Sequence, residues 1–363
     1  MPHKPLSRRD FLLVVTGSTA ATLAGCRPSD SPPPPTVYKS GALISTPVTI
    51  QGQPVEADPR YAHLTHNAPI ITDNHIFYVQ DYPQSGDTPR YDDVLENWRL
   101  TIDGWVENPL DLSYEAIRQL PEVETTRTLE CIGNPVGGSL IGNAVWGGCW
   151  FSDLLTQARV KPEAKQAKFY ASDGYSTSVD MEWITQAGVL LAYKMNEQLL
   201  PREHGYPLRI FIPELYGQKM PKWIERIEFI DYEYKGYWES RGWSDRGEVQ
   251  TNAIIQTPPH QTRIQGQVYI QGIAFAGHRA ITQVEVRVDG GEWMPTTLVQ
   301  GESPLVWTQW YVAWHPATTG TYEIEVRSTD ETGFTQQTSA NGAFGSAKPQ
   351  GTNAIHRIVL QVV

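Results

Sequence analysis

The sequence is poor in cysteine and has no long apolar run. Only three cysteines occur among 363 residues, Cys26, Cys131 and Cys149, and three cannot form the paired framework of a small disulfide-rich protein. No stretch of eighteen apolar residues occurs in the chain, so no segment is predicted to cross a membrane as a helix. Each cysteine therefore needs a separate explanation.

Motifs for attached redox groups and for nucleotide binding are also absent. The chain has no Cys-x-x-Cys-His for haem attachment and no cysteine cluster for an iron–sulfur centre. No Gly-x-Gly-x-x-Gly opens a helix, so a dinucleotide-binding turn is not indicated. The net charge of −11 argues against a nucleic-acid partner, because proteins that bind nucleic acid present a basic face.

The first segment is typical of an export signal. Ser7–Leu12 contains a twin-arginine pair, and the apolar run Phe11–Leu23 is too short for a spanning helix. Leu23–Cys26 reads Leu-Ala-Gly-Cys and resembles a bacterial lipobox. Cleavage before Cys26 and lipidation of its thiol would leave the protein anchored on the periplasmic or cell-surface side. The alternative is an ordinary exported protein whose Cys26 is discarded with the signal.

Residues 26–59 are predicted to be a Pro-rich linker and N-terminal extension after a signal of residues 1–25. Four consecutive prolines occupy positions 32–35, and Pro-rich sequence is extended and does not pack. Structure is therefore expected to begin near residue 40 or later, and the oxidoreductase domain at about residue 60.

Residues 60–250 mix strand and helix patterns. Trp98–Gly104 alternates like a strand that enters a turn. Ser113–Leu120 is predicted to be a short helix that Ser113 caps, and Ser152–Ala158 a second helix. Strands and short helices in irregular order indicate an α+β domain.

From residue 260 to 363 the helical patterns disappear. Short strands separated by turns are typical of an immunoglobulin-like β-sandwich. The predicted strands are Ile281–Val288, Trp307–Trp314, Thr321–Arg327 and His356–Val362.

The segment Thr128–Asn134 places Cys131 beside glycine and asparagine. A thiolate is a good ligand for soft or borderline metals. The alternative is a buried cysteine that acts as a small hydrophobe, and we assign that role to Cys149.

Three further segments combine small or rigid residues with polar or cationic ones. Glycine and proline allow a backbone to approach a ligand closely, and arginine binds phosphate through two hydrogen bonds. Each segment alone is weak evidence, because surface cations are usually only solvated. The segments are Thr72–His75, His204–Arg209 and Tyr216–Trp223.

In this order, these segments resemble the sulfite oxidase family of molybdopterin oxidoreductases. The resemblance covers about residues 65–245, and the tail resembles the family's immunoglobulin-like dimerisation domain. The bacterial protein-methionine-sulfoxide reductase branch shares the export signal and a similar Tyr-Gly-x-Lys-x-x-Lys segment but lacks the tail. The matching segments are Asn74-His75, Trp98–Leu100, Leu129–Asn134, Gly142–Gly148, Asp173–Tyr175, Leu191–Asn196, His204–Arg209 and Lys222-Trp223.

The resemblance implies a single-pterin molybdenum cofactor, with Cys131 as the only protein ligand to the metal. It also implies residues that line the cofactor or hold the pterin and its phosphate. These are Asn74, Phe77, Tyr78, Asp173, His204, Arg209, Met220 and Lys222.

The sequence departs from sulfite oxidases where that family binds its anionic substrate. Asp73 stands where the family has an arginine before Asn-His, and Pro135 stands where it has an arginine after Cys-x-Gly-Asn. Hydrogen bonds from charged groups are stronger than those from neutral groups. The absence of these two arginines therefore removes much of the positive potential that would bind sulfite. Asp73 would repel sulfite if it faces the pocket.

A further departure concerns the aromatic residue beside the substrate. Alignment of the Trp238-x-x-Arg241 segment puts Trp243 where the family has tyrosine, so the resemblance implies that Arg241 and Trp243 take part in catalysis. Together with Trp146 and Trp150, Trp243 suggests an aromatic, less cationic pocket.

The predicted function is an exported molybdenum oxidoreductase that transfers an oxygen atom and two electrons on a small substrate. A neutral S-oxide or N-oxide and sulfite both remain candidates, because Arg127, Lys219 or Arg241 could supply positive charge. Electrons would pass to or from a separate cytochrome or membrane haem subunit, and the tail implies a homodimer. The alternative from another class is a cofactor-free binding or scaffold protein that keeps the fold.

Overall fold

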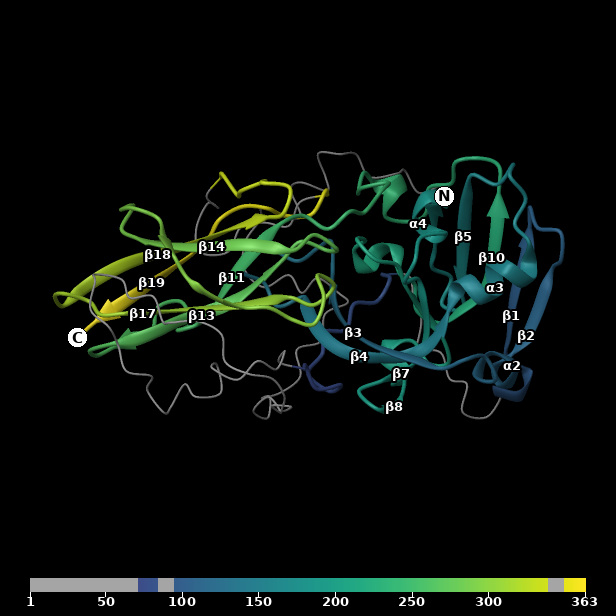
Figure 1. The fold of residues 1–363 in the computed structure, drawn as a ribbon, viewed down its shortest axis with the longest axis horizontal. Coiled ribbons are helices and arrows are strands. Elements are labelled where there is room, and N and C mark those ends of the chain that lie inside the picture. Colours follow the sequence, from purple (N-terminus) through teal and green to yellow (C-terminus); the bar gives the residue numbers. More distant parts are fainter. Residues whose placement is uncertain (1–70, 84–94, 339–348) are drawn as a thin grey trace, which may run out of the picture.

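The computed structural model describes residues 71–83, 95–338 and 349–363. The predicted signal, Cys26 and the linker lie outside the described residues. The described chain forms two bodies along the long axis of the molecule (Figure 1): an N-terminal body up to residue 249 and a tail from residue 252. No helix among the described residues is long and apolar enough to cross a membrane.

The first sheet of the N-terminal body has five strands in the order β2-β1-β10-β5-β6. The pair β1·β10 is parallel, and the other neighbours are antiparallel. Trp98–Gly104 was predicted to be a strand and contains β1. The strands are β1 (Arg99–Gly104), β2 (Leu110–Ser113), β5 (Gln166–Ala171), β6 (Ser176–Asp180) and β10 (Ile224–Ile230).

The second sheet has the order β3-β4-β7-β8, and β9 also pairs with β7. All its pairings are antiparallel. Strand β3 is an edge strand, and the loop that contains Cys131 joins it to β4. The strands are β3 (Val123–Glu130), β4 (Ile141–Trp150), β7 (Leu190–Met195), β8 (Gln198–Leu199) and β9 (Arg209–Phe211).

Helices are few and short, so the α+β expectation overstated them. Both predicted helices are present, and the Ala116 N–H donates to Ser113 Oγ at 3.1 Å, as expected for a cap. The α-helices of the described residues are α2 (Tyr114–Arg118), α3 (Phe151–Ala158) and α4 (Met181–Ile184). Single 3₁₀ turns occupy Leu95–Asn97, Arg202–His204, Gly217–Lys219 and Glu239–Arg241.

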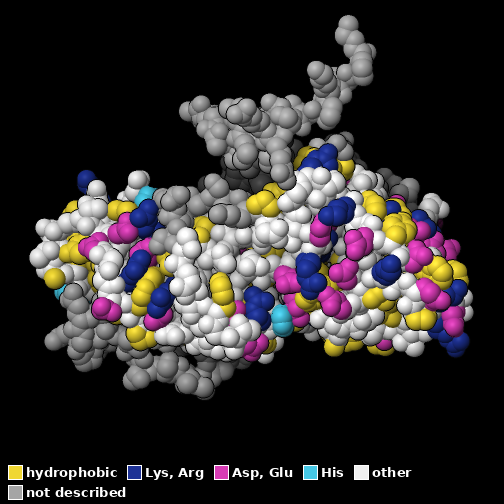
Figure 2. Space-filling model, turned by 90° about the horizontal axis from the view of Figure 1, so that it is seen from above, with side chains coloured by type: hydrophobic (Ala, Val, Ile, Leu, Met, Phe, Trp, Pro, Cys, Tyr) yellow, Lys and Arg dark blue, Asp and Glu magenta, His cyan; other side chains and the backbone are white. Residues whose placement is uncertain are grey.

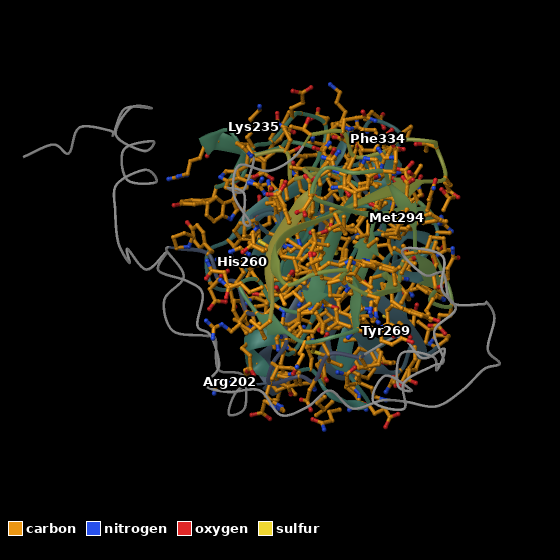
Figure 3. The ribbon with its side chains drawn as sticks, turned by 90° about the vertical axis from the view of Figure 1, so that its left-hand side faces the viewer. Arg202, Lys235, His260, Tyr269, Met294 and Phe334 are labelled. Carbon is orange, nitrogen blue, oxygen red and sulfur yellow. The ribbon has the colours of Figure 1, made fainter. Side chains whose placement is uncertain are left out.

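The tail consists of two sheets that pack face to face. Trp310 and Trp314 of one sheet and Val284 and Val286 of the other share one buried core. Seen along the long axis, His260 and Met294 lie on opposite sides of the tail (Figure 3). The immunoglobulin-like arrangement stays a prediction.

The two sheets of the tail have the orders β11-β13-β17-β16 and β12-β19-β18-β14-β15. The first contains β11 (Asn252–Thr257), β13 (Val268–Phe275), β16 (Thr297–Val299) and β17 (Thr308–Trp314). The second contains β12 (Arg263–Ile264), β14 (Ile281–Val288), β15 (Met294–Pro295), β18 (Gly320–Asp330) and β19 (His356–Val362).

The tail packs against the edge strand β3. The Thr128 N–H donates to the Leu305 carbonyl at 2.9 Å, and the Trp307 N–H donates to Thr128 Oγ1 at 2.8 Å. The unpaired N–H and C=O groups of an edge strand tend to pair with other chains, and the tail provides hydrogen-bond partners at this edge of β3. An apolar cluster then joins the two bodies. Its buried members are Ile132, Tyr216, Val249, Ile254, Ile273, Phe275, Val306 and Trp307.

Candidate functional site

Cys131 begins the loop of residues 131–140 between β3 and β4. The loop is closed at its base, because the Cys131 N–H donates to the Leu140 carbonyl at 2.9 Å. The Asn134 N–H donates to the Cys131 carbonyl at 2.9 Å, and the Gly133 N–H approaches Cys131 Sγ at 3.4 Å. The loop therefore presents a half-buried sulfur at its start.

A buried carboxylate holds this loop from behind. Glu130 is 2% exposed, and Asn134 Nδ2 donates to Glu130 Oε1 at 2.9 Å. Asn134 Oδ1 in turn accepts the Leu140 N–H at 3.0 Å. Burial raises the pKa of Glu130, and the hydrogen bonds from the amides of Asn134 and Asn252 lower it. Burial has the larger effect, so the pKa is about 7. Glu130 and Asn134 belong to the Leu129–Asn134 segment, but no role was predicted for either from the sequence. Asn252 belongs to none of the segments that were predicted to form the site.

The segment 71–83 brings Asn74 and Phe77 to the second sheet. The Asn74 carbonyl lies 2.8 Å from His204 Nε2, and Asn196 Nδ2 donates to Asn74 Oδ1 at 2.8 Å. The Phe77 ring packs edge-on against His204, with 5.5 Å between ring centroids. A Cβ at Gly142 would lie 2.6 Å from the Phe77 ring, so only glycine fits there. Residues predicted to line one ligand thus lie together.

Tyr78 connects this segment to Cys131. Burial raises the pKa of Tyr78 well above its usual value; the charge of Cys131 raises it further, and the charge of Arg209 lowers it. A Cβ at Gly217 would lie 3.5 Å from both the Tyr78 hydroxyl and the Glu130 carbonyl, so Tyr78 lies near the start of the Cys131 loop. On its other side Tyr78 stacks on Phe77, and Phe77 packs on Trp146, over which Arg209 lies.

A glycine allows the cationic segments to pack together. Gly205 has φ +117°, a left-handed conformation that side chains rarely adopt. A Cβ there would lie 3.1 Å from Lys222 Cβ and 3.2 Å from Arg209 Cβ. His204–Arg209 and Lys222 therefore meet only because position 205 has no side chain.

Arg209 is a buried cation with unused hydrogen-bonding capacity. It is 4% exposed; Nη1 donates to the His204 carbonyl at 3.0 Å, while Nε is buried and has no partner. The guanidinium packs on the Phe211 ring at 4.8 Å and on Trp146 at 5.2 Å. Burial lowers its pKa to about 10. No carboxylate among the described residues pairs with Arg209, so the site calls for an anionic ligand.

Lys222 and Asp173 flank the same corner. Lys222 Nζ lies 2.5 Å from Asp81 Oδ1 and donates to the Glu203 carbonyl at 2.9 Å. Burial lowers the Lys222 pKa, while Asp81 and, more weakly, Asp173 raise it. Asp173 Oδ1 accepts the Tyr175 N–H at 2.9 Å. Lys222 thus lies at the edge of the site, beside the Asp81 carboxylate.

Two other predicted cations lie in different surroundings. Lys219 Nζ lies 2.5 Å from Glu239 Oε1, and both side chains are almost fully buried. This pair neutralises Lys219, so it cannot supply positive charge to a substrate. Arg127 packs over Trp150 at 5.7 Å, with buried Nε and Nη1 atoms that have no partner. The side chain of Met220 packs in the hydrophobic core, and its N–H donates to the Gly217 carbonyl at 3.1 Å.

An aromatic wall borders the Cys131 loop. A Cβ at Gly133 would lie 3.6 Å from Cys131 Sγ and 3.8 Å from Trp243 Cη2, so Trp243 faces the sulfur across Gly133. Trp238 packs on Trp243 with 5.7 Å between ring centroids. The Tyr237 ring packs on Trp238, and exposed Arg241 stacks on Tyr237 with its Cζ atom 3.5 Å from the ring centroid.

The predicted pocket of three tryptophans is wrong in its composition. Trp243 borders the Cys131 loop, but Trp146 is fully buried behind Arg209. Trp150 ends β4, the strand that begins at the Cys131 loop, and covers Arg127.

The chemistry of this site follows from its donors. Among the residues that the structure describes, no group of three His, Cys, Asp or Glu side chains could hold a metal. A metal at Cys131 must therefore bring its other ligands with it. A metal carried by an anionic organic cofactor meets this requirement and also compensates Arg209.

Comparisons with known proteins agree with this chemistry. Residues 85–238 match the oxidoreductase molybdopterin binding domain, and residues 245–362 match the Mo-co oxidoreductase dimerisation domain. The chain is 30% identical to sulfite oxidase of Arabidopsis thaliana, over 68% of this chain and 75% of that protein. It is 34% identical to the oxidoreductase YuiH of Bacillus subtilis, over 46% of this chain and 82% of that protein.

A solved structure shares the fold over almost the whole chain. The sulfane dehydrogenase SoxCD of Paracoccus pantotrophus superposes with a TM-score of 0.67 at 23% identity. The match covers 94% of this chain and 96% of that chain. The chain therefore belongs to the sulfite oxidase family of molybdopterin-dependent oxidoreductases, and its cofactor is molybdenum bound to molybdopterin.

Proposed function

We propose that this enzyme transfers an oxygen atom and two electrons to or from a small substrate, at molybdenum that the Cys131 thiolate binds. The proposal rests chiefly on one observation: the segment of Phe77 and Tyr78 connects the half-buried Cys131 sulfur to the buried Arg209 guanidinium, which has no carboxylate partner among the described residues. The Tyr78 hydroxyl lies near the Glu130 carbonyl at the start of the Cys131 loop, and Phe77 packs on Trp146, over which Arg209 lies. A thiolate suits the metal, and a guanidinium suits a phosphate or an oxygen-rich pterin.

The residues of the site divide this work. When bound, the cofactor would supply two-electron redox chemistry and oxygen-atom transfer. Arg209, Lys222 and His204 would hold its pterin and phosphate, with Asp173 at the edge of that corner. Asn74, Phe77 and Tyr78 would cover it and exclude water. Met220, which lies two residues before Lys222, would border the same corner.

The arrangement favours a neutral S-oxide or N-oxide over sulfite. Glu239 neutralises Lys219, and the Asp73 carboxylate lies 2.5 Å from His75 Nδ1. Trp243 gives the Cys131 side an apolar aromatic surface. Sulfite remains the second candidate, because exposed Arg241 beside this wall could bind it.

The partners and location follow from the sequence. The chain has no haem or iron–sulfur motif of its own, so we propose a cytochrome or a membrane haem subunit as the electron partner. We also propose export by the twin-arginine route, a lipid anchor at Cys26 and a homodimer through the tail, for which the matched dimerisation domain is the support.

On the face shown in Figure 2, basic side chains are interspersed with acidic ones, and Asp and Glu gather toward the N-terminal body.

Substitution of the metal ligand tests the core of the proposal. Cys131→Ser should remove the thiolate-to-metal absorption band and reduce turnover by at least about a hundredfold, because an alcohol is a poor ligand for a soft site. Circular dichroism should show an unchanged fold. Cys149→Ser is the matched control and should keep the band. Full activity of Cys131→Ser would overturn the proposed ligation.

Removal of the buried cations Arg209 and Lys219 should change the free energy of unfolding in different ways. In cofactor-free protein, Arg209→Met removes an uncompensated buried charge, so the free energy of unfolding should stay the same or rise. Lys219→Met leaves Glu239 buried without its partner and should cost about 3–5 kcal/mol. In cells that make the cofactor, Arg209→Met should also lower the molybdenum content of the purified enzyme. Equal losses of stability in both variants would contradict the role of Arg209.

Turnover of methionine sulfoxide and of sulfite with an artificial redox dye tests the substrate class. The aromatic site should reduce the sulfoxide with the higher kcat/KM. If sulfite is the substrate, Arg241→Ala should raise its KM roughly tenfold or more, because a charged hydrogen bond contributes about 1.5–3 kcal/mol. Efficient oxidation of sulfite at low concentration would contradict the preference for a neutral substrate.

Fractionation of cells tests the anchor. The wild-type protein should sediment with membranes and be released by detergent, whereas Cys26→Ser should not acquire a lipid. A molecular mass that shows no acyl chains on the wild-type protein would rule out lipidation at Cys26.

A further inference from the structure

The tail reaches the Cys131 loop through Asn252, the first residue of β11. Asn252 Nδ2 donates to Glu130 Oε2 at 3.1 Å and to the Gln250 carbonyl at 3.0 Å. The other oxygen of Glu130 accepts Asn134 Nδ2 at 2.9 Å. One carboxylate, adjacent to Cys131 in the chain, thus bridges the loop and the tail.

The arrangement of donors is specific. Glu130 Oε2 accepts the tail amide of Asn252 at 3.1 Å, and Oε1 accepts the loop amide of Asn134 at 2.9 Å with a longer contact of 3.4 Å from Asn252. All three side chains are at most 6% exposed, so water cannot replace a lost donor without movement of the loop. A change at Asn252 therefore acts on the backbone that carries Cys131.

Two more contacts from the tail flank the same loop. On the β3 side, Thr128 binds Leu305 and Trp307. On the far side, a Cβ at Gly137 would lie 2.3 Å from His356 Nε2, so the loop backbone rests directly on this ring. His356 is itself fixed, since its Nδ1 accepts the Ile255 N–H at 2.9 Å.

We propose that the tail positions the metal ligand: Glu130 and Asn252 form a strut that sets the direction of the Cys131 thiolate. Glu130 is a positioning residue, because it acts through the loop and not on the substrate. The inference rests on the proposed ligation by Cys131, but the strut itself is a property of the protein without its cofactor. Its two parts can therefore be tested separately.

The first measurement uses full-length protein without cofactor. Asn252→Leu removes the donor at similar volume, and it should raise the hydrogen-exchange rates of the amides of residues 131–140 about tenfold or more. Val286→Ala is the control, because it makes a cavity in the tail core and touches neither Glu130 nor the loop. It should destabilise the tail and leave exchange in the loop unchanged.

The second measurement uses the holoenzyme. Asn252→Leu should shift the Mo(V) electron paramagnetic resonance spectrum and the thiolate-to-metal absorption, and it should lower kcat about tenfold with a smaller change in KM. The double variant Glu130→Gln with Asn252→Asp restores the contact between the loop and the tail, because Gln Nε2 donates to the aspartate while Gln Oε1 still accepts Asn134. It loses the bond from residue 252 to the Gln250 carbonyl, so loop exchange and spectra should return most of the way to those of the wild type.

The outcomes separate the two claims. Unchanged loop exchange in Asn252→Leu, or the same loop effect in Val286→Ala, would overturn the strut. Faster loop exchange with unaltered metal spectra would overturn the positioning of the ligand. Retention of the thiolate-to-metal band in Cys131→Ser would instead overturn the proposed function and leave the strut standing.

Discussion

The Arg209 guanidinium is a positive charge inside the protein, with one buried N–H that has no partner. An isolated buried charge costs several kcal/mol. Two other cations avoid this cost: Lys219 has Glu239, and Arg279 Nε lies 3.0 Å from Asp330 Oδ2. Arg127 is a second buried guanidinium with nitrogen atoms that have no partner among the described residues, and it lies over Trp150 at the far end of β4. The stacking of Arg209 on Trp146 and the missing side chain at Gly205 hold Arg209 in place. An anionic cofactor at Arg209 would therefore also stabilise the fold by compensating this charge.

The residues with distinctive chemistry in short motifs could be predicted from the sequence. Cys131, His204, Arg209 and Lys222 each stand in a local pattern, and the structure gathers these patterns around Tyr78 and Gly205. The contact between Glu130 and Asn252 could not be predicted, because it joins residues 122 positions apart. An asparagine at the start of a strand has no spacing that points to a partner in another domain.

The error over the tryptophans has a physical cause. Trp146 and Trp150 lie on β4, a ten-residue strand that begins next to the Cys131 loop and runs away from it. A tryptophan side chain can line a pocket or fill a core equally well. The residue types alone therefore could not show that Trp146 packs against Arg209 and Trp150 over Arg127.

The tail also makes hydrogen bonds to the N-terminal body of its own chain. It covers the free edge of β3, and an uncovered edge would pair with other chains. Because β3 leads directly into Cys131, the covered edge and the Cys131 loop are one continuous piece of backbone. A displacement of the tail would therefore disturb the hydrogen bonds of Thr128 and Glu130. The domain matched to dimerisation and the domain matched to molybdopterin binding thus share hydrogen bonds at the base of the Cys131 loop.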